Sequence, residues 1–128
     1  MFTAMTANLM VESVEDSLDF YARVLGFTEV TSVPSESGKL QFAIVAKDDL
    51  QLMFQERGNL CAEYPILMTE TVKPSLSLFI TVDNFAEFYE TVRSTTPLLA
   101  EEHMTFYDTK EFAIADNNGY VITIAEKS

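Results

Sequence analysis

Uncharged polar side chains recur at every second position of several segments that alternate between polar and apolar residues. Successive side chains of a strand point to opposite faces of its sheet, so these residues share one face. With a few apolar residues and one carboxylate, the set is Thr6, Asn8, Met10, Gln41, Gln51, Met53, Gln55, Ser77, Phe79, Thr81, Glu111, Val121 and Thr123. Burying such polar groups without partners would cost several kcal/mol each at the upper end of estimates. We therefore expect a solvated cleft that binds a small molecule.

The positions between these residues are apolar and suit a face that packs beneath helices. They are Leu9, Val11, Leu50, Leu52, Phe54, Leu78, Ile80, Val82, Tyr120, Ile122 and Ile124. Phe42 is expected to join Phe54 on this packing face, whereas Phe79 belongs to the polar face. The alternation thus predicts sheets with one buried face and one face open to a ligand.

Candidates for catalysis are few. His103 is the only histidine, and it lies beside carboxylates at the start of residues 103–108, which we expect to form a loop. It could act as a general base, although a lone histidine of this kind is more often a surface residue. Tyr64, Phe106 and Tyr107 also fall in predicted loops, where they could clamp a flat or cationic ligand or simply pack locally. No nucleophilic triad, glycine-rich phosphate loop or catalytic carboxylate pair stands out.

The elements that must position these residues form one pattern written twice. In the first copy, residues 8–11 are typical of a strand, Ser13 is placed to cap a helix, and Gly26 is placed to end it. A strand over residues 27–33 and a hairpin over residues 39–55 follow.

The second copy repeats this order about seventy residues later. It has a strand over residues 76–82, a helix capped by Asn84, a strand over residues 98–102 and a hairpin over residues 111–126. The turn of this hairpin, residues 116–119, ends in a glycine that tolerates the positive φ of a tight strand reversal.

Each copy is a βαβββ unit, which predicts an α+β fold. We place the first module at about residues 4–56 and the second at about 75–126, within a single domain of residues 1–128. Residues 57–74 show no clean period and are expected to form an irregular link. The economical arrangement has helices outside and curved mixed sheets around a central cleft.

Charge and length exclude several classes of protein. Twenty acidic residues against eight basic ones give a net charge of −12, which repels nucleic acid and attracts a cationic ligand, or only keeps the domain soluble. The single cysteine, Cys61, rules out an internal disulfide framework and disfavours a zinc cluster. No stretch approaches the roughly 20 apolar residues that span a bilayer, and the start does not resemble a signal peptide. We expect a cytoplasmic protein without a membrane partner.

Several motifs together resemble those of the vicinal oxygen chelate superfamily. They are Ser17-Leu18-Asp19-Phe20-Tyr21, Leu25-Gly26-Phe27, Leu50-Gln51-Leu52-Met53 and Glu111-Phe112-Ala113-Ile114-Ala115-Asp116-Asn117-Asn118-Gly119-Tyr120. This group includes glyoxalase I, extradiol dioxygenases, fosfomycin-resistance enzymes and bleomycin-resistance proteins. The resemblance covers nearly the whole chain and implies the glyoxalase/bleomycin-resistance fold, but these are scaffold residues, and a fold does not determine function.

The resemblance also implies where a metal would bind. Catalytic members hold a divalent metal with four His, Glu or Gln side chains, and the corresponding positions of this chain are Thr6, Gln51, Ser77 and Thr123. Only Gln51 suits a metal, because neutral hydroxyl groups are poor ligands for zinc, iron or nickel. The resemblance thus favours the bleomycin-resistance branch, whose members are homodimers that sequester a cationic ligand.

Our leading hypothesis is a metal-independent small-molecule binding protein, a homodimer, for a cationic or amphipathic ligand whose identity the residues do not select. The expected ligand-binding residues are Asn8, Gln41, Gln51, Met53, Gln55, Ser77, Phe79, Thr81, His103, Tyr107, Glu111 and Thr123. We assign no catalytic residue, metal or cofactor. Two alternatives stay open. One is a glyoxalase- or dioxygenase-type enzyme with an altered metal set from Gln51, His103, Glu56 or Glu126, and the other is a non-catalytic regulatory subunit.

Overall fold

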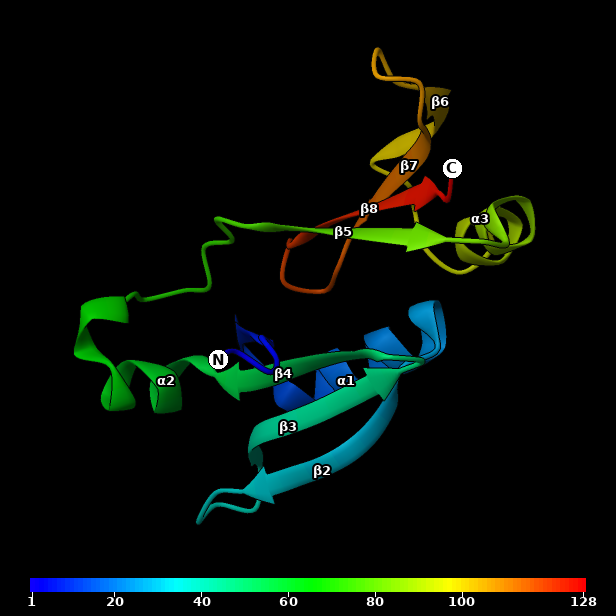
Figure 1. Cartoon of the computed structure of the whole chain (residues 1–128). Helices are drawn as coiled ribbons and strands as arrows, with labels where there is room; N and C mark the ends of the chain where they lie inside the picture. The colour runs from blue at the N-terminus through cyan, green and yellow to red at the C-terminus, as the bar shows by residue number, and fades with distance from the viewer. The chain divides into compact units, whose positions relative to one another are not determined.

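The computed structural model describes all 128 residues, which divide into two compact units, Met1–Lys73 and Pro74–Ser128. Each unit holds one four-stranded sheet (Figure 1). The strands lie in the order β1-β4-β3-β2 in the first unit and β5-β8-β7-β6 in the second, so the two sheets share one topology. This confirms the α+β class and the two βαβββ copies, while the cleft stays a prediction.

The first unit has one helix against its sheet. Its elements are β1 (Ala7–Val11), α1 (Val14–Leu25), β2 (Thr28–Pro34), β3 (Leu40–Lys47) and β4 (Leu50–Glu56). Strand β1 runs parallel to β4, and β3 is antiparallel to both β4 and β2. Helix α1 covers one face of the sheet (Figure 1). The opposite face is called the open face below.

The second unit repeats this arrangement with an aromatic core. Its elements are β5 (Ser77–Val82), α3 (Phe85–Arg93), β6 (Ala100–Met104), β7 (Lys110–Ala115) and β8 (Val121–Glu126). The ring of Phe112 on β7 lies 5.5 Å from that of Phe85 and 5.0 Å from that of Tyr89, both on α3. In the first unit Tyr21 of α1 lies 4.9 Å from Phe54 of β4. Such pairs add specific ring contacts to the burial of apolar area, so each helix is tied to its own sheet.

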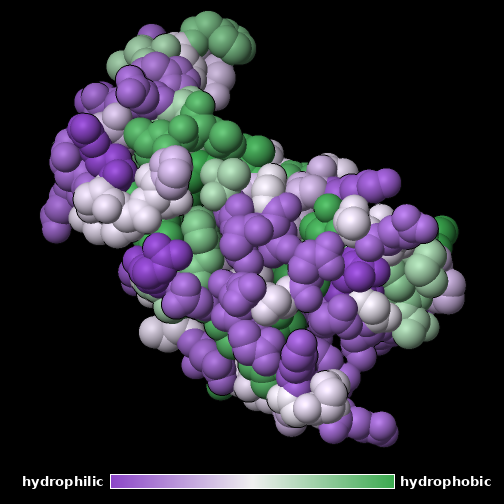
Figure 2. All heavy atoms as spheres, turned by 180° about the vertical axis from the view of Figure 1, so that it is seen from behind, coloured by the Kyte–Doolittle hydropathy of each residue, from purple (hydrophilic) through white to green (hydrophobic).

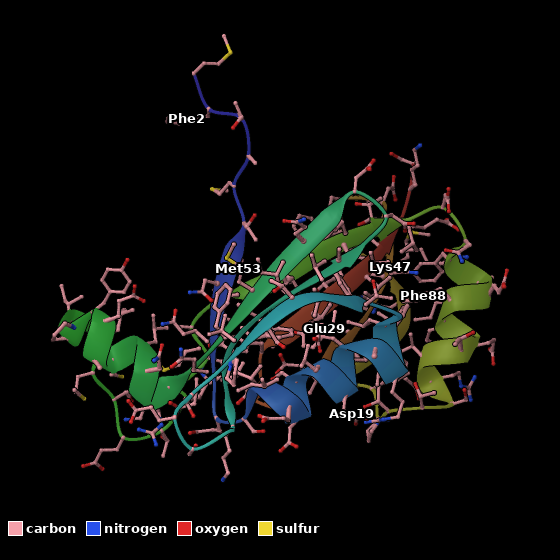
Figure 3. All side chains as sticks on the ribbon, turned by 90° about the horizontal axis from the view of Figure 1, so that it is seen from below. Phe2, Asp19, Glu29, Lys47, Met53 and Phe88 are labelled. Atoms are coloured by element: carbon pink, nitrogen blue, oxygen red, sulfur yellow. The ribbon has the colours of Figure 1, made fainter.

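Helix α1 begins and ends where the sequence predicts. The Ser13 Oγ accepts a hydrogen bond from the backbone N–H of Asp16 at 3.1 Å, and Gly26 ends the helix at a φ of 79°. Asp19 lies on the outer side of the helix, away from the sheet (Figure 3). Helix α3 begins directly after Asn84, as predicted, but the predicted side-chain cap was wrong, because the Asn84 side chain makes no capping hydrogen bond.

The closing hairpin is confirmed. Oδ1 of Asp116 accepts hydrogen bonds from the backbone N–H groups of Asn118 at 2.8 Å and Tyr120 at 3.0 Å. Gly119 has a φ of 93°, the conformation for which glycine was expected. A side-chain oxygen thus replaces water on two backbone donors of the turn.

Residues 57–63 form a helix, α2 (Arg57–Glu63), and a 3₁₀ turn, η1 (Pro65–Leu67), follows it. The expectation of an irregular link was wrong for this stretch. The Glu56 carboxylate accepts bonds from the backbone N–H groups of Gly58 at 2.8 Å and Asn59 at 2.9 Å, and so caps α2 where β4 ends. Glutamate is not a preferred cap and glycine is a weak helix former, which hid this helix from pattern analysis.

The strand expected at residues 98–102 lies two residues later, as β6. His103 is therefore part of a strand, and its assignment to a loop was wrong. The pairing of β6 with β7 is irregular between Ala100 and His103. Between these two positions β6 has one residue more than β7, which shifts the register. Such an extra residue leaves no sequence signal of its own.

Hydrophilic side chains cover most of the face shown in Figure 2. Ion pairs join Arg23 to Asp19, Arg57 to Glu12 and Arg93 to Glu90, and the twenty acidic residues far outnumber the eight basic ones. Phe2 lies at the far end of a segment that extends away from the first sheet (Figure 3). No helix has both the length and the apolar character needed to cross a membrane.

One ion pair holds the segment that follows α2. Glu12 accepts a hydrogen bond from Nε of Arg57 at 2.9 Å and another from the backbone N–H of Val72 at 2.7 Å. Arg57 also donates to the carbonyl oxygen of Thr69 at 3.3 Å. The guanidinium of Arg57 and then the Val72 N–H hold the pKa of Glu12 below its usual value of 4.5. The carboxylate therefore ties β1, α2 and residues 69–72 together.

We predict that this clasp makes stability depend on pH. Because the pKa of Glu12 is lowered in the folded state, its stabilising effect is complete above pH 4.5 and is lost as pH falls through the lower folded pKa. Glu12→Gln should lower the free energy of unfolding at pH 7 and have little effect once Glu12 is protonated. Urea unfolding across this pH range measures the difference, with the exposed Glu29→Gln as control. Equal losses at every pH would contradict the prediction.

Candidate functional site

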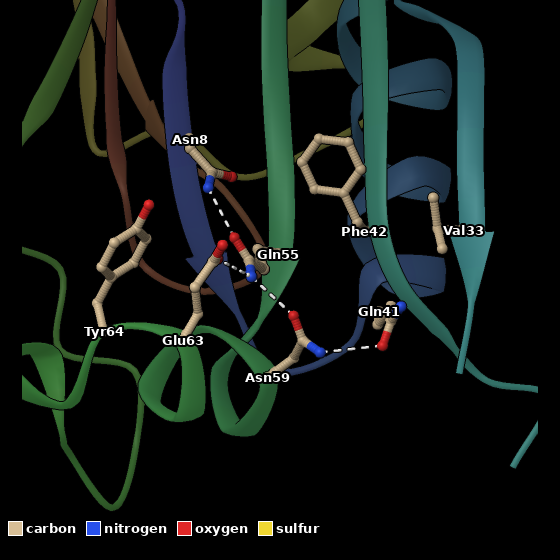
Figure 4. A pocket seen from close by; sticks show the side chains of 8 residues that line it. All are labelled: Asn8, Val33, Gln41, Phe42, Gln55, Asn59, Glu63 and Tyr64. Atoms are coloured by element: carbon tan, nitrogen blue, oxygen red, sulfur yellow. Dashed lines mark hydrogen bonds between the residues drawn. The ribbon is translucent and has the colours of Figure 1, made fainter. Parts of the chain in front are cut away.

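The open face of the first sheet carries a pocket of about 370 Å³ (Figure 4). Its lining comes from β1, β2, β3, β4 and the segment that begins with α2: Asn8, Val33, Gln41, Phe42, Gln55, Asn59, Glu63 and Tyr64. We call it the amide pocket, after its four Asn and Gln side chains. It brings together three of the residues expected from the sequence, namely Asn8, Gln41 and Gln55.

Hydrogen bonds join the amide side chains into a chain (Figure 4). Asn8 Nδ2 donates to Oε1 of Gln55 at 2.9 Å, and Nε2 of Gln55 donates to Oδ1 of Asn59 at 2.7 Å and to Oε1 of Glu63 at 2.9 Å. Asn59 Nδ2 in turn donates to Oε1 of Gln41 at 2.9 Å. Gln55 is 6% exposed, so these bonds satisfy an amide that has almost no access to water.

Strand pairing and helix spacing place these groups. Gln55 lies opposite Met10 of β1 and Phe42 of β3, which puts it in the middle of the open face. Helix α2 begins directly after β4, and Asn59 and Glu63 are four residues apart, so both side chains lie on the same side of the helix. Both side chains accept a hydrogen bond from Nε2 of Gln55, because the capped helix turns back over the end of the strand.

Sequence analysis missed Asn59 and Glu63, which it left in a predicted link. The one signal that the sequence offered is the spacing of Asn59 and Glu63, four residues apart, which would place both on the same side of a helix. The position of Phe42 was also predicted wrongly. It pairs with Gln55 and lines the amide pocket, whereas Ala43 and Val45 are buried on the α1 side. Residues 42–46 are apolar at both parities, so alternation could not assign their faces.

The positions at which the resemblance places metal ligands lie in both units. Thr6 and Gln51 line a second pocket, of about 420 Å³, at the other end of the first sheet. In the second unit, Thr123 of β8 lies opposite Phe79, and Ser77 begins β5. No group of three His, Cys, Asp or Glu side chains is placed to hold a metal ion. Met53 lies between Gln51 and Gln55 on the open face.

Three expected residues also come together in the second unit. Glu111 is 5% exposed, and its Oε2 accepts hydrogen bonds from the Tyr107 hydroxyl and the Thr109 Oγ1, both at 2.8 Å. His103 lies opposite Glu111 across β6 and β7, and its Nδ1 is 2.8 Å from the carbonyl oxygen of Glu101. A carbonyl oxygen only accepts, so Nδ1 is the donor. Hydrogen bonds within the second unit thus hold the side chains of Glu111 and His103.

Strand β5 presents its polar side to solvent. Ser77, Phe79 and Thr81 are exposed, while Leu78, Ile80 and Val82 between them are half-buried. The predicted alternation is therefore confirmed for this strand. Phe79 is 58% exposed, the largest apolar surface on the strand.

Comparison with known families adds a broad match. The family model described as the Glyoxalase/Bleomycin resistance protein/Dioxygenase superfamily matches residues 4–124. None of the curated proteins matches the sequence significantly.

Solved structures resemble the chain over its whole length. A glyoxalase-related enzyme from Fulvimarina pelagi has a TM-score of 0.78 at 19% identity, covering 99% of this chain and 89% of the other. A superfamily member from Sphaerobacter thermophilus DSM 20745 has a TM-score of 0.77 at 17% identity, with 99% and 98% covered. TioX from Micromonospora sp. ML1 has a TM-score of 0.74 at 14% identity, with 98% of both chains covered. At these identities the likeness concerns the fold.

We predict that the two glutamines of β4 differ sharply in their contribution to stability. Gln55→Ala removes the partner of Nδ2 of Asn8, Oδ1 of Asn59 and Oε1 of Glu63, and should lower the free energy of unfolding by about 1–3 kcal/mol. Gln51 is exposed on the same strand and face, so Gln51→Ala should change the free energy of unfolding by less than about 0.5 kcal/mol. Urea unfolding of both variants measures this, and equal effects would show that the chain of amides does not stabilise the fold.

Proposed function

The chain belongs to the Glyoxalase/Bleomycin resistance protein/Dioxygenase superfamily, and on that premise we propose that it binds a small molecule without a metal ion. The observation that carries the proposal is the amide pocket. Its volume of about 370 Å³ falls within the range of roughly 300–1,000 Å³ that is usual for ligand sites. It also combines a few oriented polar groups with apolar walls, as such sites do.

The lining of the pocket indicates the kind of ligand. Four amides and one carboxylate supply hydrogen-bonding groups, and Val33, Phe42 and Tyr64 supply apolar surface. No lysine, arginine or histidine lies in the lining, so an anionic ligand would find no opposite charge. A cationic or amphipathic ligand suits both the pocket and the acidic surface.

The chemistry of the family metal positions supports metal independence. Threonine and serine hydroxyls at Thr6, Ser77 and Thr123 are weak ligands for transition metals, which leaves Gln51 as one adequate donor. Binding through hydrogen bonds and apolar contact needs no such donor set. The ligand would then be held, not transformed.

Calorimetric titration tests the proposal. Protein dialysed against EDTA should give saturable heat with bleomycin or with the planar cation proflavine, and added zinc should not change the affinity. Elemental analysis of protein purified without a chelator should find no stoichiometric transition metal. A metal that is lost in Gln51→Ala would overturn metal independence, and flat titrations with folded protein would overturn binding.

The homodimer implied by the resemblance is part of this proposal. Large apolar side chains exposed on the second unit, among them Phe79 and Phe106, are consistent with an interface. Light scattering should give twice the 14.4 kDa mass of the chain. A mass equal to one chain at micromolar concentration would contradict it.

A further inference from the structure

We infer that the amide pocket selects an organic cation with N–H groups, such as a primary ammonium, and that Glu63 determines this choice. The inference rests on the proposed binding function and adds the class of ligand and the residue that recognises it. Glu63 lies on α2 at the rim of the pocket, next to Tyr64, and on the Asn8 side of Gln55 (Figure 4). Its carboxylate is the one charged group in the lining.

The direction of every hydrogen bond in the pocket follows from this carboxylate. A carboxylate only accepts, so Gln55 must turn its Nε2 toward Glu63 and its Oε1 toward Asn8. Asn8 must then present Nδ2 to Gln55. On the other side Nε2 of Gln55 meets Oδ1 of Asn59, which directs Nδ2 of Asn59 to Oε1 of Gln41. The carboxylate thus orients four amide groups that could otherwise each be reversed.

The hydrogen-bonding groups of the pocket that have no partner within the chain indicate which ligand it would bind. Oε2 of Glu63 and Oδ1 of Asn8 accept no hydrogen bond from the chain, so two acceptors are free on one side of the pocket. Nε2 of Gln41 is a free donor on the other side, near the apolar walls formed by Phe42 and Val33 (Figure 4). A cation with N–H groups satisfies the two acceptors, and its apolar body would lie along Phe42.

The charge of Glu63 is not compensated within the chain. It takes part in none of the three ion pairs, and no basic residue lines the pocket. The neighbouring ring of Tyr64 offers a cation a second favourable contact. A quaternary ammonium has the charge but no N–H group, so it would leave Asn8 and Glu63 without donors.

NMR titration with three matched probes tests the inference. Benzylammonium should shift the side-chain NH₂ signals of Asn8, Gln55 and Asn59, and it should bind more tightly than benzyltrimethylammonium or neutral benzyl alcohol. Glu63→Gln should weaken benzylammonium binding by about tenfold, because a charge-assisted hydrogen bond is lost. Glu70→Gln removes the same charge from an exposed position outside the pocket and should leave the affinity within about twofold.

The outcomes separate the inference from the proposed function. If Glu63→Gln and Glu70→Gln have equal effects, or if all three probes bind the wild type equally, binding stands and the role of Glu63 is overturned. If no probe shifts any pocket signal of the folded wild type, the pocket is no binding site, and the proposed function fails together with the inference.

Discussion

A buried amide group must keep its hydrogen bonds, and in the first unit this constraint falls on Gln55. Its side chain is 6% exposed in the middle of a sheet, and its partners come from β1 and from two positions of α2. Losing them would leave donors and acceptors shielded from water. The short helix α2, which has little intrinsic tendency to form, is therefore held over the sheet by the same bonds that shape the pocket.

Each unit has one buried polar side chain in its sheet that needs hydrogen-bond partners, but the two side chains lie on different strands. In the first, the row across the sheet reads Met10, Gln55 and Phe42, and in the second the corresponding row reads Thr81, Ala125 and Glu111. The buried polar group is Gln55 on β4 in the first unit. In the second unit it is Glu111 on β7, which corresponds to β3 and not to β4. Glu111 is accordingly satisfied by Tyr107 and Thr109 from its own hairpin instead of by a helix. The repeated scaffold thus carries a buried amide whose partners include a helix in the first unit, and a buried carboxylate whose partners are local in the second.

Alternation and capping residues predicted the scaffold because they reflect local physics. Ser13, Gly26 and the turn at residues 116–119 act through bonds within a few residues, so their effect is readable in sequence. The candidate site was predicted only in part. Asn59 and Glu63 belong to a helix that tertiary contacts stabilise, and Phe42 lies in a run that is apolar on both faces. The faces of such residues depend on strand register, which local pattern does not determine.

Net charge and pocket chemistry act at different ranges in this molecule. A surplus of twelve negative charges raises the concentration of all cations near the surface, but physiological salt screens it beyond about 8 Å. Such a field attracts cations without distinguishing one from another. Discrimination requires groups at hydrogen-bonding distance whose directions are already determined. Glu63 determines these directions through Gln55. Because its carboxylate can only accept, Gln55 has one orientation, and each further amide along the chain of hydrogen bonds is then oriented as well.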